Sequence, residues 1–132
     1  MEYLLDTCTL LWSLFDDPRL SKEVVSELTN NKNMIFVSTA SLWEIDLKHN
    51  KHPELMPYTA YDIFRTIENR TNYRLLDLRP EHIFDLHSIM LEKVNNDPFD
   101  NILMSLAKNE RLTLITHDTK ITLSKEINTL VY

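Results

Sequence analysis

Short apolar runs alternate with longer amphipathic segments along the whole chain, and this order constrains the fold more than any other feature. The runs are rich in leucine, β-branched and aromatic residues, which is typical of strands, and they cover residues 3–5, 34–37, 73–78, 112–116 and 129–132. The segments between most of them are long enough for a helix to return the chain to the same end of a sheet, so the strands run in parallel. We therefore expect an α/β fold of three α/β/α layers, in which helices flank a central parallel sheet of four to five strands.

The segments between the strands carry helix periodicity and helix-start signals. We expect helices over residues 9–15, 22–30, 40–49, 60–69, 80–93 and 98–107, and a short helix or turn over 121–127. The start of the sixth helix is the best defined, because Asp97 can cap it and Pro98 suits its first position. No internal repeat or linker interrupts the pattern, so we expect residues 1–132 to form one domain.

The composition is that of an ordinary globular domain and excludes several functional classes. Apolar residues make up 43% and charged residues 26% of the 132 positions, which allows a hydrophobic core. The net charge of -6 argues against nucleic-acid binding through overall charge, but it is compatible with an enzyme that concentrates acids at a metal site. The absence of glycine excludes glycine-rich phosphate-binding loops.

Cysteine content and hydropathy indicate a cytoplasmic protein. The single cysteine, Cys8, excludes an internal disulfide and a cysteine-based zinc site, and we expect it to be a small buried side chain. No segment approaches the ~20 apolar residues of a membrane helix, and residues 1–6 lack the features of a signal peptide. We therefore expect no contact with a membrane.

Four acidic residues lie at positions that a parallel sheet brings to one edge. Asp6 follows the first strand, and Asp118 follows the strand that ends at Thr116. Asp100 lies in the first turn of the helix before that strand, and Glu44 lies about one turn into the helix after the second strand. Ligands of parallel α/β sheets gather beyond the carboxyl ends of the strands, so we expect the four carboxylates to converge there.

Converging carboxylates cannot all remain ionised without a cation, because like charges repel at short range. Oxygen ligands alone select Mg²⁺ or Mn²⁺, and the five histidines lack metal-ligand spacing and are expected on the solvated surface. One or two such ions suit the attack of an activated water on a phosphodiester. Thr116 is either an ordinary strand residue or a hydroxyl that supports this water.

Each acid also has a simpler explanation when it is taken alone. Asp6 and Asp118 can each cap the helix that follows, Asp100 can complete a capping box, and Glu44 can face solvent. Asp97 is better explained as a cap than as a metal ligand, because the Asp-Pro start already accounts for it. The occurrence of all four remaining acids in one pattern favours the shared site.

Four short motifs occur in order along nearly the whole chain. They are Leu4-Leu5-Asp6-Thr7 with Leu10-Leu11-Trp12, Ser38-Thr39-Ala40-Ser41-Leu42-Trp43-Glu44-Ile45 with Lys48, Asp97-Pro98-Phe99-Asp100, and Leu114-Ile115-Thr116-His117-Asp118. In this combination the chain resembles a PIN-domain ribonuclease, specifically the VapC-type toxin of a bacterial type II toxin–antitoxin system. Each motif is weak alone, but four in order and at family-like spacing form a strong signal.

The resemblance implies a PIN-like fold and a Mg²⁺- or Mn²⁺-dependent endoribonuclease that cleaves structured cellular RNA such as tRNA or rRNA. It assigns metal ligation to Asp6, Glu44, Asp100 and Asp118, with Thr116 in a supporting catalytic role. It also implies a homodimer and a small antitoxin protein that blocks the acidic pocket, often with a basic side chain. The acidic net charge of the chain suits such a partner.

The chain departs from the family's usual pattern in three places. Asn95 and Asn96 precede the third motif, where the family often has a histidine, and Asn101 follows it in place of the usual arginine. A glycine that is common before the last strand is replaced around Glu110 and Arg111. These changes leave the four acids intact and affect the substrate contact that the arginine would make.

Other protein classes fit the sequence less well. A phosphate-accepting receiver domain needs paired acids after the first strand, and a haloacid-dehalogenase-like phosphatase needs a second aspartate where Cys8 stands. The main alternative is a catalytically silent PIN-like domain that serves as a protein- or RNA-binding module. The four intact acids favour the enzyme.

Overall fold

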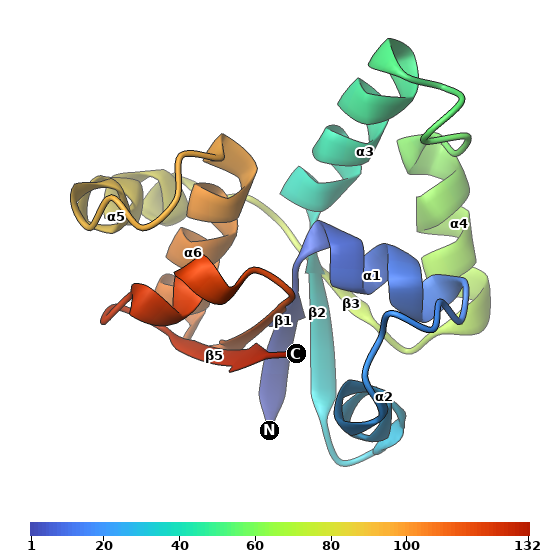
Figure 1. The fold of residues 1–132 in the computed structure, drawn as a ribbon, viewed down its shortest axis with the longest axis horizontal. Helices are drawn as coiled ribbons and strands as arrows, with labels where there is room; N and C mark the ends of the chain where they lie inside the picture. Colours follow the sequence, from blue (N-terminus) through green and yellow to red (C-terminus); the bar gives the residue numbers. More distant parts are fainter.

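A central sheet of five parallel strands organises the computed structural model, which describes residues 1–132 (Figure 1). The strands lie in the order β3-β2-β1-β4-β5, and every neighbouring pair is parallel. Their bounds are β1 Glu2–Leu5, β2 Met34–Ser38, β3 Arg74–Leu76, β4 Thr113–Thr116 and β5 Asn128–Val131. The prediction of a parallel sheet of four to five strands is confirmed.

Six α-helices and one 3-10 helix connect and cover the strands. They are α1 Thr7–Leu14, α2 Lys22–Thr29, α3 Thr39–Lys51, α4 Ala60–Arg70, α5 Pro80–Leu91, α6 Pro98–Glu110 and the 3-10 helix η1 Thr119–Leu123. All six predicted helices are present, with ends that differ by a few residues. The edge strand predicted over 73–78 is shorter than expected, because β3 pairs only with β2, which turns into α3 after Ser38.

Successive strand residues point to opposite faces of the sheet and build two separate cores. Tyr3 and Leu5 pack into the core beneath α1, α2 and α4, whereas Leu4 packs into the core beneath α5 and α6. Strand β4 repeats the alternation, with Ile115 in the first core and Leu114 in the second. Figure 1 shows α5 and α6 on one side of the sheet and α1, α2 and α4 on the other, which confirms the three-layer α/β/α class.

Helix α6 is buried on nearly all sides and anchors the carboxyl edge of the sheet. Seven successive residues, 101–107, are buried because the helix packs against both the sheet and α5. Its start is as predicted: Asp97 accepts a hydrogen bond from the Phe99 N–H at 2.8 Å, and Pro98 takes the first position. The helix ends at Arg111 in the left-handed conformation (φ 57°, ψ 44°), which is where a glycine would avoid steric cost.

Two side chains lie where the sequence did not place them. His82 is fully buried rather than at the surface, because it joins α5 to the end of α6. Its Nδ1 accepts the Arg79 N–H at 2.9 Å, so Nε2 carries the proton and donates to Glu110 at 2.9 Å. Cys8 is exposed rather than buried, because it lies on the side of α1 that borders a pocket.

The length and hydropathy of the helices can be compared with the requirements of a membrane span. None of them combines the length and the apolar character that crossing a bilayer requires.

Candidate active site

The carboxyl ends of β1 and β4 bring Asp6 and Asp118 together, as the sequence predicts. The two strands are neighbours with Leu5 opposite Ile115, and the Asp6 N–H continues the pairing to the Ile115 carbonyl at 3.0 Å. Thr116 lies between the two acids. Its hydroxyl donates to Asp6 Oδ2 at 2.7 Å and accepts the Asp118 N–H at 3.1 Å, so one buried side chain orients both segments.

The two strand-end acids also cap the helices that follow them. Asp6 Oδ1 accepts the Thr9 N–H at 2.7 Å at the start of α1, and Asp118 Oδ1 accepts the Lys120 N–H at 2.9 Å at the start of η1. Capping uses one oxygen of each carboxylate and leaves the other directed elsewhere. The capping explanation and the shared-site explanation are therefore compatible for both residues.

Asp100 joins this group from the first turn of α6. The side-chain amide of Asn95 donates to Asp100 Oδ2 at 3.0 Å and to Asp118 Oδ2 at 2.7 Å. Two carboxylate oxygens from separate elements thus lie within hydrogen-bonding distance of a single nitrogen. Asp97 caps the helix as expected and also lines the same pocket.

Glu44 reaches the site from α3 and does not face solvent. The residue is only 7% exposed, and its Oε1 accepts the Thr7 hydroxyl at 2.6 Å. Its Oε2 forms an ion pair with Lys48 at 2.8 Å, one turn further along the helix. Because Thr7 follows Asp6 directly, this hydrogen bond ties α3 to the end of β1.

A cavity of about 310 Å³ lies between these elements. Its ten lining residues include five carboxylates and a single lysine: Asp6, Thr7, Cys8, Trp12, Glu44, Lys48, Asp97, Asp100, His117 and Asp118. The four predicted acids therefore share one pocket, whereas Thr116 is buried behind Asp6 and does not line it. We call this cavity the acidic pocket.

The crowding of carboxylates changes the ionisation of one of them. Desolvation and, after it, the negative charges of the other four carboxylates, Asp97 first, together raise the pKa of Asp100 to about 7. The surrounding negative charge therefore disfavours full ionisation of Asp100 at neutral pH. A bound cation would relieve this excess.

The carboxylate oxygens of the acidic pocket suit a hard divalent cation, although their side chains are not arranged as a complete metal site. No group of three or more His, Cys, Asp or Glu side chains stands in metal-site geometry. The carboxylate oxygens accept hydrogen bonds from protein groups instead, and each such oxygen retains a lone pair for a metal. Oxygen ligands of this kind are those that Mg²⁺ and Mn²⁺ prefer.

Several residues of the site escaped the sequence interpretation. Asn95 precedes the third motif and Thr7 ends the first half of the first motif, but neither was assigned a role, and only their contacts reveal one. Trp12 and His117 line the pocket with their rings 5.2 Å apart in a T-shaped arrangement. Desolvation, and then the charge of Asp6, raise the pKa of the Cys8 thiol, which disfavours the reactive thiolate form.

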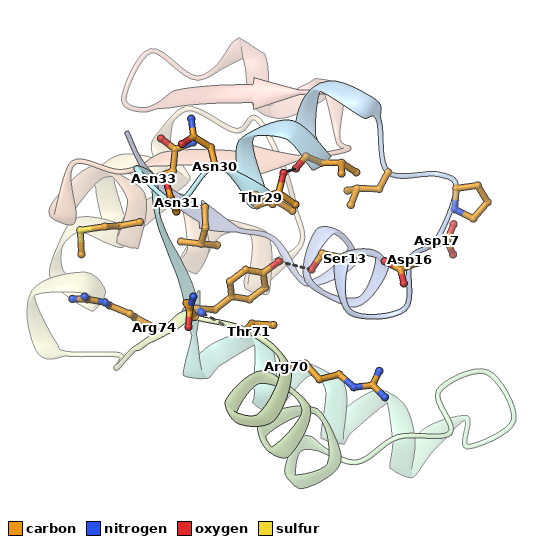
Figure 2. A pocket seen from close by; sticks show the side chains of 18 residues that line it. Ser13, Asp16, Asp17, Thr29, Asn30, Asn31, Asn33, Arg70, Thr71 and Arg74 are labelled. Atoms are coloured by element: carbon orange, nitrogen blue, oxygen red, sulfur yellow. Dashed lines mark hydrogen bonds between the residues drawn. The ribbon is translucent and has the colours of Figure 1, made fainter.

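A second and larger cavity, which we call the groove, lies near the other end of α1 (Figure 2). It measures about 760 Å³ and is lined mainly by polar side chains from α1, α2, β2 and β3 and the loops next to them. The Tyr73 hydroxyl donates to Ser13 at 3.1 Å inside it. None of the four predicted acids lines this groove.

Comparison with known proteins assigns the chain to a family. Residues 3–125 match the family model of the PIN domain, so the chain belongs to the PIN-domain family. PIN domains are generally nucleases, which supports a hydrolase that acts on nucleic acids. No curated protein matches the chain in sequence.

Solved structures of bacterial VapBC proteins share the fold. The chain is similar to VapBC2 from Rickettsia felis bound to promoter DNA, with a TM-score of 0.75, 19% identity, and coverage of 99% of this chain and 98% of that one. It is also similar to DNA-bound VapBC from Salmonella typhimurium (TM-score 0.73, 15% identity, 99% and 98% covered). VapBC-1 from nontypeable Haemophilus influenzae gives a TM-score of 0.67 at 18% identity, with the same coverage. The predicted PIN-like fold is confirmed.

Proposed function

We propose that the chain is a divalent-metal-dependent endoribonuclease and acts as the toxin of a VapC-type toxin–antitoxin pair. The observation that carries the proposal is the convergence of four carboxylates from four separate segments on one small pocket, in a chain of the PIN-domain family. Asp6, Glu44, Asp100 and Asp118 are the metal ligands of this proposal. An excess of carboxylates over cations suits metal binding and does not suit direct binding of phosphate.

Residues around the pocket orient the proposed metal ligands through hydrogen bonds. Thr116 and Thr7 hold Asp6 and Glu44 through hydrogen bonds of 2.7 Å and 2.6 Å. The Lys48 ammonium compensates part of the charge of Glu44 and is the one cationic side chain available to a phosphate in the pocket. Mg²⁺ or Mn²⁺ bound here supplies an activated water and stabilises negative charge on the phosphodiester.

The proposal extends to the partners of the chain. The similar structures are described as VapBC proteins, and one from Klebsiella pneumoniae is described as a toxin–antitoxin complex. We infer a cognate antitoxin that inserts a basic side chain into the acidic pocket, because five carboxylates face a single ammonium there. A homodimer in the cytoplasm with a structured RNA substrate completes the proposal.

Cleavage assays with purified protein test the proposal. A structured RNA such as bulk tRNA is incubated with the protein in Mg²⁺ or Mn²⁺, and EDTA is expected to abolish cleavage. Asp6→Asn and Asp100→Asn are expected to lower the rate at least about 100-fold, because they remove a ligand rather than an outer support. Glu68→Gln, an exposed residue of α4, is the matched control and should cleave normally.

The second candidate function is a catalytically silent binding module with the same fold. It predicts RNA or protein binding without cleavage and without an effect of EDTA. Cleavage that persists in EDTA and in both aspartate variants contradicts the metal-dependent nuclease and indicates a contaminating activity.

A further inference from the structure

We propose that Asn95 is a positioning residue, whose side-chain amide holds Asp100 and Asp118 in the relative orientation that a divalent cation requires. The inference rests on the proposed metal site and adds a residue that neither the motifs nor the family model assigns. Asn95 lies in the loop between α5 and α6.

The contacts of Asn95 use both donors and the oxygen acceptor of its side chain. Both hydrogens of Nδ2 are directed at carboxylates, Asp100 at 3.0 Å and Asp118 at 2.7 Å. Its Oδ1 accepts the Asp97 N–H at 2.7 Å. This last contact fixes which end of the amide is oxygen, because a backbone N–H can only donate.

A second asparagine, Asn101, fixes the backbone of the loop that carries Asn95. Asn101, on α6, is only 7% exposed, and its Nδ2 donates to the backbone carbonyl of Asn95 at 3.2 Å. The Asn101 side chain faces inward toward the loop. The two asparagines therefore form one unit that anchors the amide at the mouth of α6.

The amide is suited to this role because it is neutral and donates twice. Asp100 and Asp118 belong to different elements, α6 and the turn after β4, and nothing else among their hydrogen bonds joins them directly. Without the amide, two like charges would face each other and rotate apart. Hydrogen bonds from outer groups that orient metal ligands typically change metal affinity 10–100-fold.

Calorimetric titration of the metal-free protein with Mn²⁺ tests the inference without any RNA. Asn95→Ala is expected to raise the Mn²⁺ dissociation constant about 10–100-fold. Asn95→Leu keeps a similar volume without the donors, and it should show the same loss if the alanine variant folds poorly. Asn96→Ala is the matched control, since its side chain is exposed and forms no hydrogen bond within the protein, and it should bind Mn²⁺ like the parent chain.

The outcomes separate this inference from the proposed function. Folded Asn95 variants that bind Mn²⁺ as tightly as the parent chain overturn the positioning role alone, even if their free energy of unfolding falls. A parent chain that binds no Mn²⁺ overturns the metal centre and the positioning role together. A selective loss of Mn²⁺ affinity supports the inference whether or not the protein cleaves the RNA chosen for assay.

Discussion

The groove is larger than the acidic pocket, but only the acidic pocket concentrates charge of one sign. The groove is the larger, at about 760 Å³ against about 310 Å³, yet its charged residues are of both signs. The acidic pocket gathers five carboxylates around one lysine. The candidate active site therefore differs from the groove in its arrangement of charge and is not the larger of the two cavities.

Two aspartates make the difference concrete. Asp17, in the groove, accepts hydrogen bonds from the Arg19 guanidinium, and these contacts lower its pKa to about 2. Asp100, in the acidic pocket, has no cation beside it, and desolvation together with neighbouring carboxylates raises its pKa to about 7. The ionised aspartate is thus stabilised in the groove and destabilised in the acidic pocket. Asp100 is therefore the better candidate for metal binding.

The largest expected effect is on the free energy of unfolding, when an apolar side chain near each cavity is truncated. Leu103→Ala in α6, the helix that carries Asp100, should lower the free energy of unfolding by about 2–5 kcal/mol, because its side chain is fully buried in the core beneath α5 and α6. Leu28→Ala beside the groove should cost clearly less, because Leu28 is only partly buried. Urea unfolding of both variants measures the difference. Equal costs would show that the two cavities rest on equally rigid supports.

Metal binding should distinguish the cavities next. At a hundredfold excess over its dissociation constant, Mn²⁺ should stabilise the parent chain by about 2.7 kcal/mol, because it binds only the folded state. Asp6→Asn should remove this gain, and Asp16→Asn in the groove should retain it. Thermal unfolding with and without Mn²⁺ provides the measurement. A gain that survives Asp6→Asn would place the metal outside the acidic pocket.

The pH dependence of stability should have opposite signs at the two aspartates. The folded pKa of Asp100 lies above its unfolded value, so the folded state binds the extra proton and stability falls as pH rises from about 4 to 7. Without divalent metal, Asp100→Asn should therefore be more stable than the parent chain at pH 8, by about 1–2 kcal/mol after screening of a half-exposed group, with no difference near pH 4.

Asp17→Asn is the matched comparison and should behave in the reverse way. The folded pKa of Asp17 is lowered, so its contribution is present above pH 4 and disappears as pH falls toward 2. Denaturant unfolding at several pH values measures both variants. Curves for Asp100→Asn that parallel the parent chain at every pH would mean that Asp100 ionises normally.

The sequence by itself determined the layers of the fold and the candidates for the site. Apolar runs of strand length, separated by helix-length segments, leave few arrangements other than a parallel sheet covered on both faces. Because parallel strands share one carboxyl edge, the positions of Asp6 and Asp118 could be inferred from strand ends alone. Asp97 and Pro98 likewise define the start of α6 through local backbone chemistry, which needs no distant contact.

Tertiary structure alone decided which polar groups meet. Glu44 could not be told from a surface glutamate until α3 packed against the end of β1, where Thr7 binds it. The contact of Asn95 with Asp118 could not be predicted either, because the two residues lie 23 positions apart and meet only when the start of α6 packs beside the end of β4. The burial of His82 is likewise not predictable from its own segment, because its ring nitrogen contacts Glu110 from another helix. Periodicity specifies which face of an element is buried, whereas hydrogen-bond partners distant in sequence are set only when the elements pack.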